Sequence, residues 1–258
     1  MSEPVIKLIE TKYGTFHAQE HDLITEQLIS YSAHTRNELS MVLDHIEITD
    51  TVIDIGAHIG TYSIPMANRA SQGRVISIEA DLDSYKLLIK NIDSNKLQDR
   101  VAAYHFLATG SKLNYSKGDN IMENSGANYY LPSEENPEMQ GIDINSWITT
   151  LNIQDIDFIK LDIEGMEYEV LSTLKDILKK YRPKLYIEIV EHQLNRTGST
   201  PKAIQELLDS VGYKYYVNSY LRNSNEDHYI KTEIRDFGYS KFFDVLALPI
   251  KPATQNVR

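Results

Sequence analysis

Val52-Ile53-Asp54-Ile55-Gly56-Ala57-His58-Ile59-Gly60 is the stretch that decides the fold, because an apolar run ends in an acid and two glycines follow where a helix is expected to begin. Glycine in such a turn lets the backbone approach a ligand closely, which indicates a nucleotide cofactor. A dinucleotide loop reads G-x-G-x-x-G, whereas His58 stands at the second glycine position, where a pyrophosphate needs bare backbone. The spacing therefore disfavours NAD and FAD and favours S-adenosylmethionine, which has no phosphate.

A second acid supports this interpretation. Glu79 ends the next apolar run, 23 residues after Gly56, where a carboxylate can accept both ribose hydroxyls of an adenosine ligand. In the alternative interpretation, Asp54 caps the following helix and Glu79 is a solvated strand end. The predicted cofactor contacts from this part of the chain are Asp54, Gly56, Ala57, His58, Gly60 and Glu79.

The rest of the chain alternates short β-rich apolar runs with segments of helical periodicity. This pattern is typical of one α/β domain, a Rossmann-like, mostly parallel sheet with helices on both faces. The last two runs lie too close together for a helical crossover, so we expect an antiparallel pair at the sheet edge. The seven predicted strands cover residues 51–55, 74–79, 101–107, 156–161, 184–190, 213–217 and 242–248.

The predicted organisation has three parts. Residues 1–50 form a helical segment that packs on the cofactor cleft, because an apolar stripe of helical spacing runs up to the first central strand. Residues 51–250 form the cofactor-binding domain, and residues 251–258 form a tail.

Two long segments, residues 114–141 and 218–240, are polar and rich in turn-forming residues, so both are predicted to be loops. Loops of this length in a compact domain are either binding lids or disordered insertions. We expect residues 124–130 to enter the rim of the cleft.

Composition narrows the function classes. The formal charge is -11, from 37 acidic against 26 basic residues, which repels a polyanion, so nucleic acid is not an expected partner. No apolar stretch approaches the roughly 20 residues of a membrane-spanning helix. The first residues lack the features of a secretory signal and the chain has no cysteine, so we expect a cytoplasmic location. No pattern in the sequence indicates the oligomeric state.

Together these residues resemble the FkbM family of S-adenosylmethionine-dependent methyltransferases, over residues 14–248. The resemblance includes the glycine loop through Tyr62 and Val75-Ile76-Ser77-Ile78-Glu79-Ala80, although relatives commonly carry proline where Ala80 stands. Its most distinctive part is Asp157-Phe158-Ile159-Lys160-Leu161-Asp162-Ile163-Glu164-Gly165-Met166-Glu167.

The resemblance implies a class I methyltransferase fold with cofactor contacts at Asp54, Gly56, Gly60 and Glu79. It also implies that Ala108 lies beside the adenine. Members of the family mostly methylate hydroxyl groups, so the expected acceptor is a small molecule, a sugar or a glycan.

The candidate catalytic residues follow two central strands, because ligands of an open α/β sheet gather outside the carboxyl ends of its strands. Asp162 and Glu164 follow the fourth strand, and Glu188 and His192 end the fifth. Our hypothesis is that Asp162 orients the cofactor or the acceptor, that Glu188 or His192 removes the proton, and that Glu164 holds the constellation. Alternatively, Glu164 only favours the positive end of the next helix and His192 is a surface residue.

Other functions stay open. These oxygens and the imidazole are compatible with Mg²⁺ or Mn²⁺, but sequence order does not establish the geometry, so no metal ligand is predicted. The alternatives are an N-methyltransferase acting on an amine, a non-catalytic protein that binds S-adenosylmethionine, and a nicotinamide oxidoreductase, which His58 disfavours.

Overall fold

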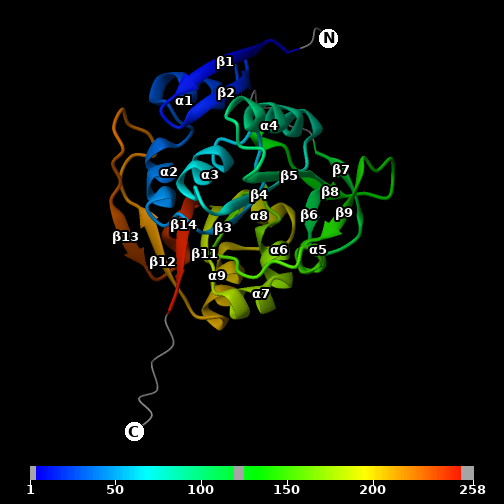
Figure 1. Ribbon diagram of the computed structural model, residues 1–258. Helices are drawn as coiled ribbons and strands as arrows, with labels where there is room; N and C mark the ends of the chain where they lie inside the picture. The colour runs from blue at the N-terminus through cyan, green and yellow to red at the C-terminus, as the bar shows by residue number, and fades with distance from the viewer. Residues whose placement is uncertain (1–3, 119–124, 251–258) are drawn as a thin grey trace.

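The centre of the molecule is an eight-stranded sheet with the order β13-β12-β14-β11-β10-β3-β4-β5 (Figure 1). The computed structural model describes residues 4–118 and 125–250, so the predicted tail at 251–258 lies outside the described residues. Five strands are parallel: β3 (Thr51–Ile55), β4 (Arg74–Glu79), β5 (Val101–His105), β10 (Phe158–Leu161) and β11 (Lys184–Val190). Three antiparallel strands complete one edge: β14 (Phe242–Pro249), β12 (Tyr213–Asn218) and β13 (Lys231–Ile234).

This sheet confirms the predicted α/β class and corrects its details. It has eight strands and not seven, because β13 arises within residues 218–240, which were predicted to be a loop. The predicted antiparallel pair is β12 and β14, with β13 added outside it. The predicted third strand, residues 101–107, ends at His105, and Leu107 begins β6 in a separate sheet.

Strand β3 lies between β4 and β10, so the chain builds the sheet outward from β3 in two directions. It passes first through β4 to β5, and then returns to the other side of β3 as β10 and β11. In a doubly wound sheet, the crevice for a ligand opens where the strand order reverses, outside the carboxyl ends of the strands. That place is the end of β3 and β10.

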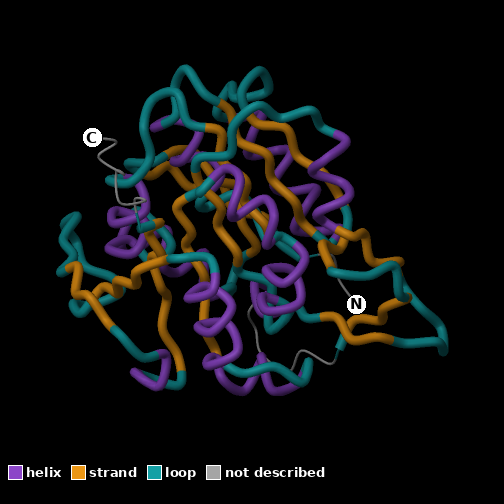
Figure 2. The backbone as a smooth tube through the Cα atoms, turned by 90° about the horizontal axis from the view of Figure 1, so that it is seen from below, coloured by secondary structure: helices purple, strands orange, loops and turns teal. Residues whose placement is uncertain are grey.

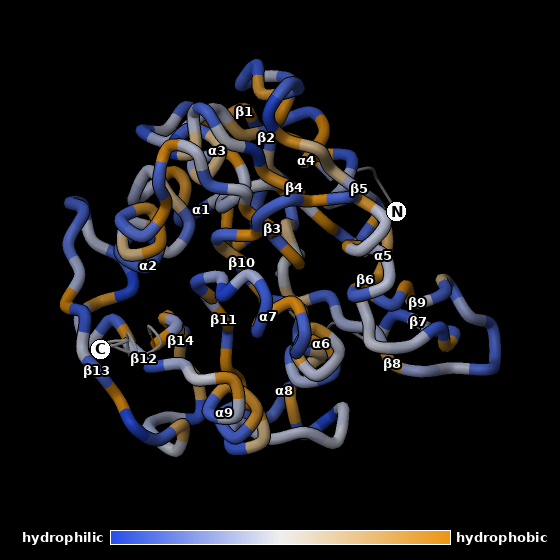
Figure 3. The backbone as a smooth tube through the Cα atoms, turned by 60° about the horizontal axis from the view of Figure 1, so that its bottom comes forward, coloured by the Kyte–Doolittle hydropathy of each residue, from blue (hydrophilic) through white to orange (hydrophobic). Residues whose placement is uncertain are grey.

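Two layers of helices cover the sheet (Figure 2). Successive strand residues point to opposite faces, so Ile53 of β3 packs with the layer α5 to α9, whereas Val52 packs with the layer α1 to α4. Figure 3 shows hydrophobic residues along the central strands and a hydrophilic loop projecting beyond β8 and β9. The helices are α1 (Leu23–Tyr31), α2 (Arg36–Leu43), α3 (Ser63–Arg69), α4 (Leu82–Ser94), α5 (Ile144–Thr150), α6 (Glu167–Thr173), α7 (Lys175–Tyr181), α8 (Glu191–Arg196) and α9 (Pro201–Ser210).

The N-terminal segment contains an antiparallel hairpin, β1 (Ile6–Thr11) and β2 (Gly14–Gln19), in addition to helices α1 and α2. The side chain of Asn91 on α4 fixes the hairpin, since its Oδ1 accepts the His17 amide at 2.6 Å and its Nδ2 donates to the carbonyls of His17 and Ile59. One amide group therefore ties the hairpin to the glycine loop.

A small four-stranded sheet lies beside β5 and α6 (Figure 1). It consists of β6 (Leu107–Thr109), β7 (Asn114–Lys117), β8 (Tyr130–Pro132) and β9 (Met139–Asp143). The prediction of a loop over residues 114–141 is therefore wrong where β7, β8 and the start of β9 lie. Buried Leu107, Tyr115 and Tyr130 form its core together with Met166, so this sheet is a packed unit at the edge of the crevice.

Candidate active site

A cleft of about 930 Å³, counting its open mouth, lies at the carboxyl ends of β3, β4, β10 and β11. One end is lined by Phe106, Leu107 and Ala108, which are buried and apolar. The other end carries ionisable side chains from β10 and β11. A cleft that is apolar at one end and charged at the other suits a ligand with an aromatic base at one end and a charged group at the other.

The glycine loop after β3 forms one wall of the cleft and is fixed by its own backbone. Gly56 has φ +84°, and a Cβ there would lie 1.7 Å from the carbonyl oxygen of Asp162, so no other residue fits without moving β10. The amides of Gly56 and Ala57 donate to the Ile78 carbonyl at 2.9 and 3.0 Å, and the His58 amide donates to Glu79 Oε2 at 2.7 Å. These three amides are thus directed at the end of β4 and not into the cleft.

Glu79 lies on the wall of the cleft at the end of β4. Its Oε2 accepts the His58 amide and its Oε1 accepts the Asp81 amide, both at 2.7 Å. Burial raises the pKa of Glu79 to about 7, although these two hydrogen bonds act in the opposite direction. Each carboxyl oxygen has a second lone pair, so this fixed group can still accept hydroxyl donors from a ligand.

Asp54 is fully buried and does not line the cleft. Its Oδ2 accepts a hydrogen bond from Ser63 Oγ at 2.6 Å, and its Oδ1 lies 3.3 Å from Lys160 Nζ. Gly60 is also absent from the wall, whereas Ala57, His58 and Ala108 line it. Ala108 lies on β6 of the small sheet.

Lys160 is a functional candidate that sequence reasoning did not single out. It lies on β10, its side chain is 4% exposed, and it lines the cleft. Nζ donates to the Gly56 carbonyl at 3.0 Å and lies 3.5 Å from Asp162 Oδ2. The available signal was a lysine within an otherwise apolar central strand, because a lysine is almost never buried unless it is paired.

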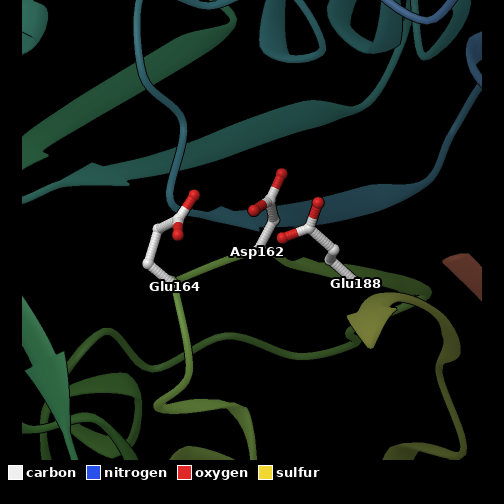
Figure 4. Close-up of side chains that lie close together, drawn as sticks. All are labelled: Asp162, Glu164 and Glu188. Atoms are coloured by element: carbon white, nitrogen blue, oxygen red, sulfur yellow. The ribbon is translucent and has the colours of Figure 1, made fainter. Parts of the chain in front are cut away.

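Three of the predicted catalytic residues meet in the cleft. Asp162, Glu164 and Glu188 each offer one carboxylate oxygen, and these atoms lie within 4.8 Å of one another (Figure 4). Glu188 Oε2 is buried without a hydrogen-bond partner. Burial and then the neighbouring Asp162 raise the pKa of Glu188 well above its ordinary value and that of Glu164 to about 8. Oxygen atoms at this spacing can also hold a divalent cation.

The structure does not bring His192 to this group. His192 follows Glu191 at the start of α8, its side chain is exposed, and it is absent from the cleft wall. A different imidazole lines the cleft: that of His34, between α1 and α2. His34 Nδ1 is buried without a hydrogen-bond partner, and burial, followed by the charge of Arg222, lowers the pKa of His34 to about 3. His34 is therefore a neutral hydrogen-bonding group.

The loop predicted at the rim contributes Gly126, Asn128 and Tyr130 to the wall, while Asn124 lies outside the described residues. Arg196 of α8 fixes this loop, since its guanidinium lies 3.8 Å from the centre of the Tyr129 ring. The same guanidinium donates to the Glu164 carbonyl at 3.1 Å. The rim loop and the carboxylate cluster are thus connected through one side chain.

Comparison with known proteins gives a family match. The family model described as "Methyltransferase FkbM domain" matches residues 54–215. A tRNA(Phe) (4-demethylwyosine(37)-C(7)) aminocarboxypropyltransferase of Pyrococcus horikoshii is 41% identical over 56 residues, which are 22% of this chain and 20% of that protein. The chain thus spans about a fifth of the length of this curated relative.

Solved structures are similar at low identity. An S-adenosylmethionine-dependent methyltransferase of Aquifex aeolicus has a TM-score of 0.46 and 13% identity, over 87% of this chain and 96% of that one. An FkbM methyltransferase of Methylobacillus flagellatus has a TM-score of 0.45 and 15% identity, over 79% and 44%. The family assignment rests on the sequence model and not on these two structures.

Proposed function

Because the chain belongs to the FkbM methyltransferase domain family, we propose that it transfers a methyl group from S-adenosylmethionine to a hydroxyl group of a small molecule, a sugar or a glycan. The observation that carries this proposal is the cleft at the end of β3 and β10, whose wall contains Glu79 from β4 on one side of β3 and Lys160 and Asp162 from β10 on the other. Residues 51–250 would form the catalytic domain, and residues 1–50 would complete the wall of its cleft.

The donor set of the cleft fits this cofactor. Phe106 and Ala108 form the apolar end for the adenine, and the fixed carboxyl of Glu79 can accept the ribose hydroxyls. Lys160 and Asp162 place opposite charges at the other end, where the amino-acid portion would lie. When bound, S-adenosylmethionine supplies an electrophilic methyl group on a sulfonium.

The carboxylate cluster would perform the proton chemistry. Asp162 orients the reacting groups, since it lines the cleft 3.5 Å from the Lys160 ammonium. Glu188 Oε2 accepts the proton of the acceptor hydroxyl, and the raised pKa of Glu188 makes its ionised form a stronger base. Glu164 holds the constellation, because its Oε2 accepts from Gln193 Nε2 at 2.6 Å. With His192 exposed, we assign the proton to Glu188.

The charge of the cleft limits the acceptor class. Four carboxyl groups, those of Glu79, Asp162, Glu164 and Glu188, line the cleft, and the whole chain has a charge of -11. The net charge of the chain repels phosphates and other anions, and the carboxyl groups of the cleft can accept hydrogen bonds from hydroxyl or amine groups, which favours a neutral or cationic acceptor over nucleic acid. An amine acceptor, and so N-methylation, needs less help from a base and is the second candidate. The 56-residue match to a tRNA-acting enzyme makes tRNA a required arm of the test.

None of the helices in the described part of the chain combines the length and the apolarity that a bilayer crossing needs. The proposal is tested with purified protein by titration calorimetry with S-adenosylmethionine and with NAD. Tritiated methyl transfer to pools of sugars, glycans, amines and tRNA should follow. We expect binding of S-adenosylmethionine alone and label in a hydroxyl-bearing pool. Binding of NAD alone would overturn the proposal, and binding without any transfer would indicate a non-catalytic protein.

A further inference from the structure

We infer that the Lys160 ammonium binds the α-carboxylate of the cofactor's amino-acid portion, and that Asp162 beside it receives the α-amino group. This inference rests on the proposed function, since it assigns a role within the cofactor site. It adds Lys160 to the cofactor contacts that the sequence predicts at Asp54 and in the glycine loop.

Several polar groups of the glycine loop are already engaged within the protein. The amides of Gly56 and Ala57 donate to Ile78, and the amide of His58 donates to Glu79. The carboxylate of Asp54 lies behind the wall, where Ser63 and Lys160 hold it. These three amides and the Asp54 carboxylate are therefore engaged within the protein, so we look for a cationic partner for the charged end of a ligand in another part of the wall.

Lys160 brings positive charge to the wall of the cleft. Of the described residues that line the cleft, Lys160 is the one that carries an ammonium or a guanidinium. Asp162, Glu164, Glu188 and Glu79 share the wall with it, and their carboxyl groups offer no positive charge. Lys160 is consequently the strongest partner that this wall offers to a ligand carboxylate.

The Lys160 ammonium has few tight hydrogen-bond partners in the protein. An ammonium has three N–H donors, and Nζ donates to the Gly56 carbonyl at 3.0 Å. Its two ion-pair neighbours, Asp54 Oδ1 at 3.3 Å and Asp162 Oδ2 at 3.5 Å, both lie beyond the usual length of an N–H···O bond. The ring of Tyr62, with its centre 5.4 Å from Nζ, covers another side. The other two donors therefore have only loose carboxylate partners, one of which, Asp162, lines the cleft together with Lys160.

The Lys160–Asp162 pair is complementary to the charges of a free amino acid. Lys160 and Asp162 form adjacent positive and negative groups on one strand end, 3.5 Å apart. A free amino-acid end carries its ammonium and its carboxylate on the same carbon, so it presents the same two charges in the opposite order. A paired contact satisfies both wall charges and both ligand charges, which an adenosine ligand without an amino-acid end cannot do.

The test compares three adenosine thioethers by titration calorimetry. S-adenosylhomocysteine has both charged groups, 5′-(3-aminopropyl)thioadenosine lacks only the carboxylate, and 5′-methylthioadenosine lacks both. We expect Lys160→Met to weaken S-adenosylhomocysteine binding at least about tenfold, or ~1.4 kcal/mol, and to change binding of the other two by less than about threefold. Lys160→Arg, which keeps the charge, should lose less. Lys184→Met is the matched control, because Lys184 of the neighbouring strand donates to the His45 carbonyl outside the cleft.

The outcomes separate the alternatives. Equal weakening of all three ligands by Lys160→Met would show that Lys160 only supports the loop, and would overturn the inference. If Lys160→Met does not fold, the ¹⁵Nζ resonance of Lys160 is measured in the unsubstituted protein instead. This resonance should shift when S-adenosylhomocysteine binds but not when the aminopropyl ligand binds. Identical shifts with the two ligands would refute the contact. Failure of the unsubstituted protein to bind any of the three ligands would instead refute the proposed function.

Discussion

Replacement of Gly56 by alanine should damage both the stability and the cofactor site. The added Cβ would lie 1.7 Å from the Asp162 carbonyl oxygen, where ordinary contact begins at 3.4 Å, so β10 or the glycine loop must move by more than an ångström. The left-handed φ of +84° costs an L-residue ~1–2 kcal/mol, and overpacking costs a further ~1–3 kcal/mol. We expect the free energy of unfolding to fall by ~2–5 kcal/mol.

Gly198→Ala is the matched control for this change. Gly198 has nearly the same φ, +77°, but a Cβ there meets nothing within 4 Å, so only the backbone cost of ~1–2 kcal/mol remains. Urea unfolding of both variants gives the difference, and titration with S-adenosylhomocysteine shows whether the cleft survives. If Gly56→Ala loses no more stability than Gly198→Ala and binds the ligand normally, the contact between the loop and β10 does not constrain the site.

Three further predictions follow from the carboxyl groups. Burial raises the pKa of Glu38 from 4.5 to about 8 and that of Glu79 from 4.5 to about 7, so the folded protein holds protons that the unfolded chain releases. The contribution of these two groups to the free energy of unfolding should therefore fall as the pH rises from 4.5 to 8. In urea titrations across that range, Glu38→Gln should make the free energy of unfolding less dependent on pH, and an unchanged dependence would contradict this. Asp162→Asn and Glu188→Gln should each lower turnover by ~10²-fold or more while leaving the thermal unfolding unchanged. His192→Ala should keep full turnover. The reverse pattern would make His192 the base. Treatment with EDTA should leave the affinity for S-adenosylhomocysteine unchanged, because Lys160 already supplies positive charge beside Asp162. Tighter binding when Mn²⁺ is added back would indicate a cation bound by Asp162, Glu164 and Glu188.

The sequence was sufficient for the elements whose pattern is set by burial. The central strands β3, β4, β10 and β11 are mostly apolar because helices cover both of their faces, and they lie where they were predicted, although β10 begins two residues later. Strand β13, Lys231-Thr232-Glu233-Ile234, has three exposed residues and one buried residue. An edge strand with so little burial has no apolar pattern to find, so it was predicted as part of a loop.

The sequence predicted only those site residues that directly follow a central strand. Asp162, Glu164 and Glu188 meet because β10 and β11 are parallel neighbours, and the sequence order alone placed them at one edge. His192 shares that location in sequence, but α8 begins at Glu191 and carries His192 into solvent. The pairing of Lys160 with Asp54 depends on β3 and β10 lying side by side in register, which no local pattern encodes.

The wall of the cleft contributed by Ile24 and His34 has a consequence for how such proteins diversify. Both residues precede the range 54–215 that the family model matches, while the cofactor contacts proposed for Lys160 and Glu79 lie inside it. Asn91 bonds both to His17 of the N-terminal hairpin and to Ile59 of the glycine loop, so this part of the wall cannot be exchanged independently of the loop. A substitution confined to the Ile24 or His34 side chain changes the wall while leaving those hydrogen bonds in place.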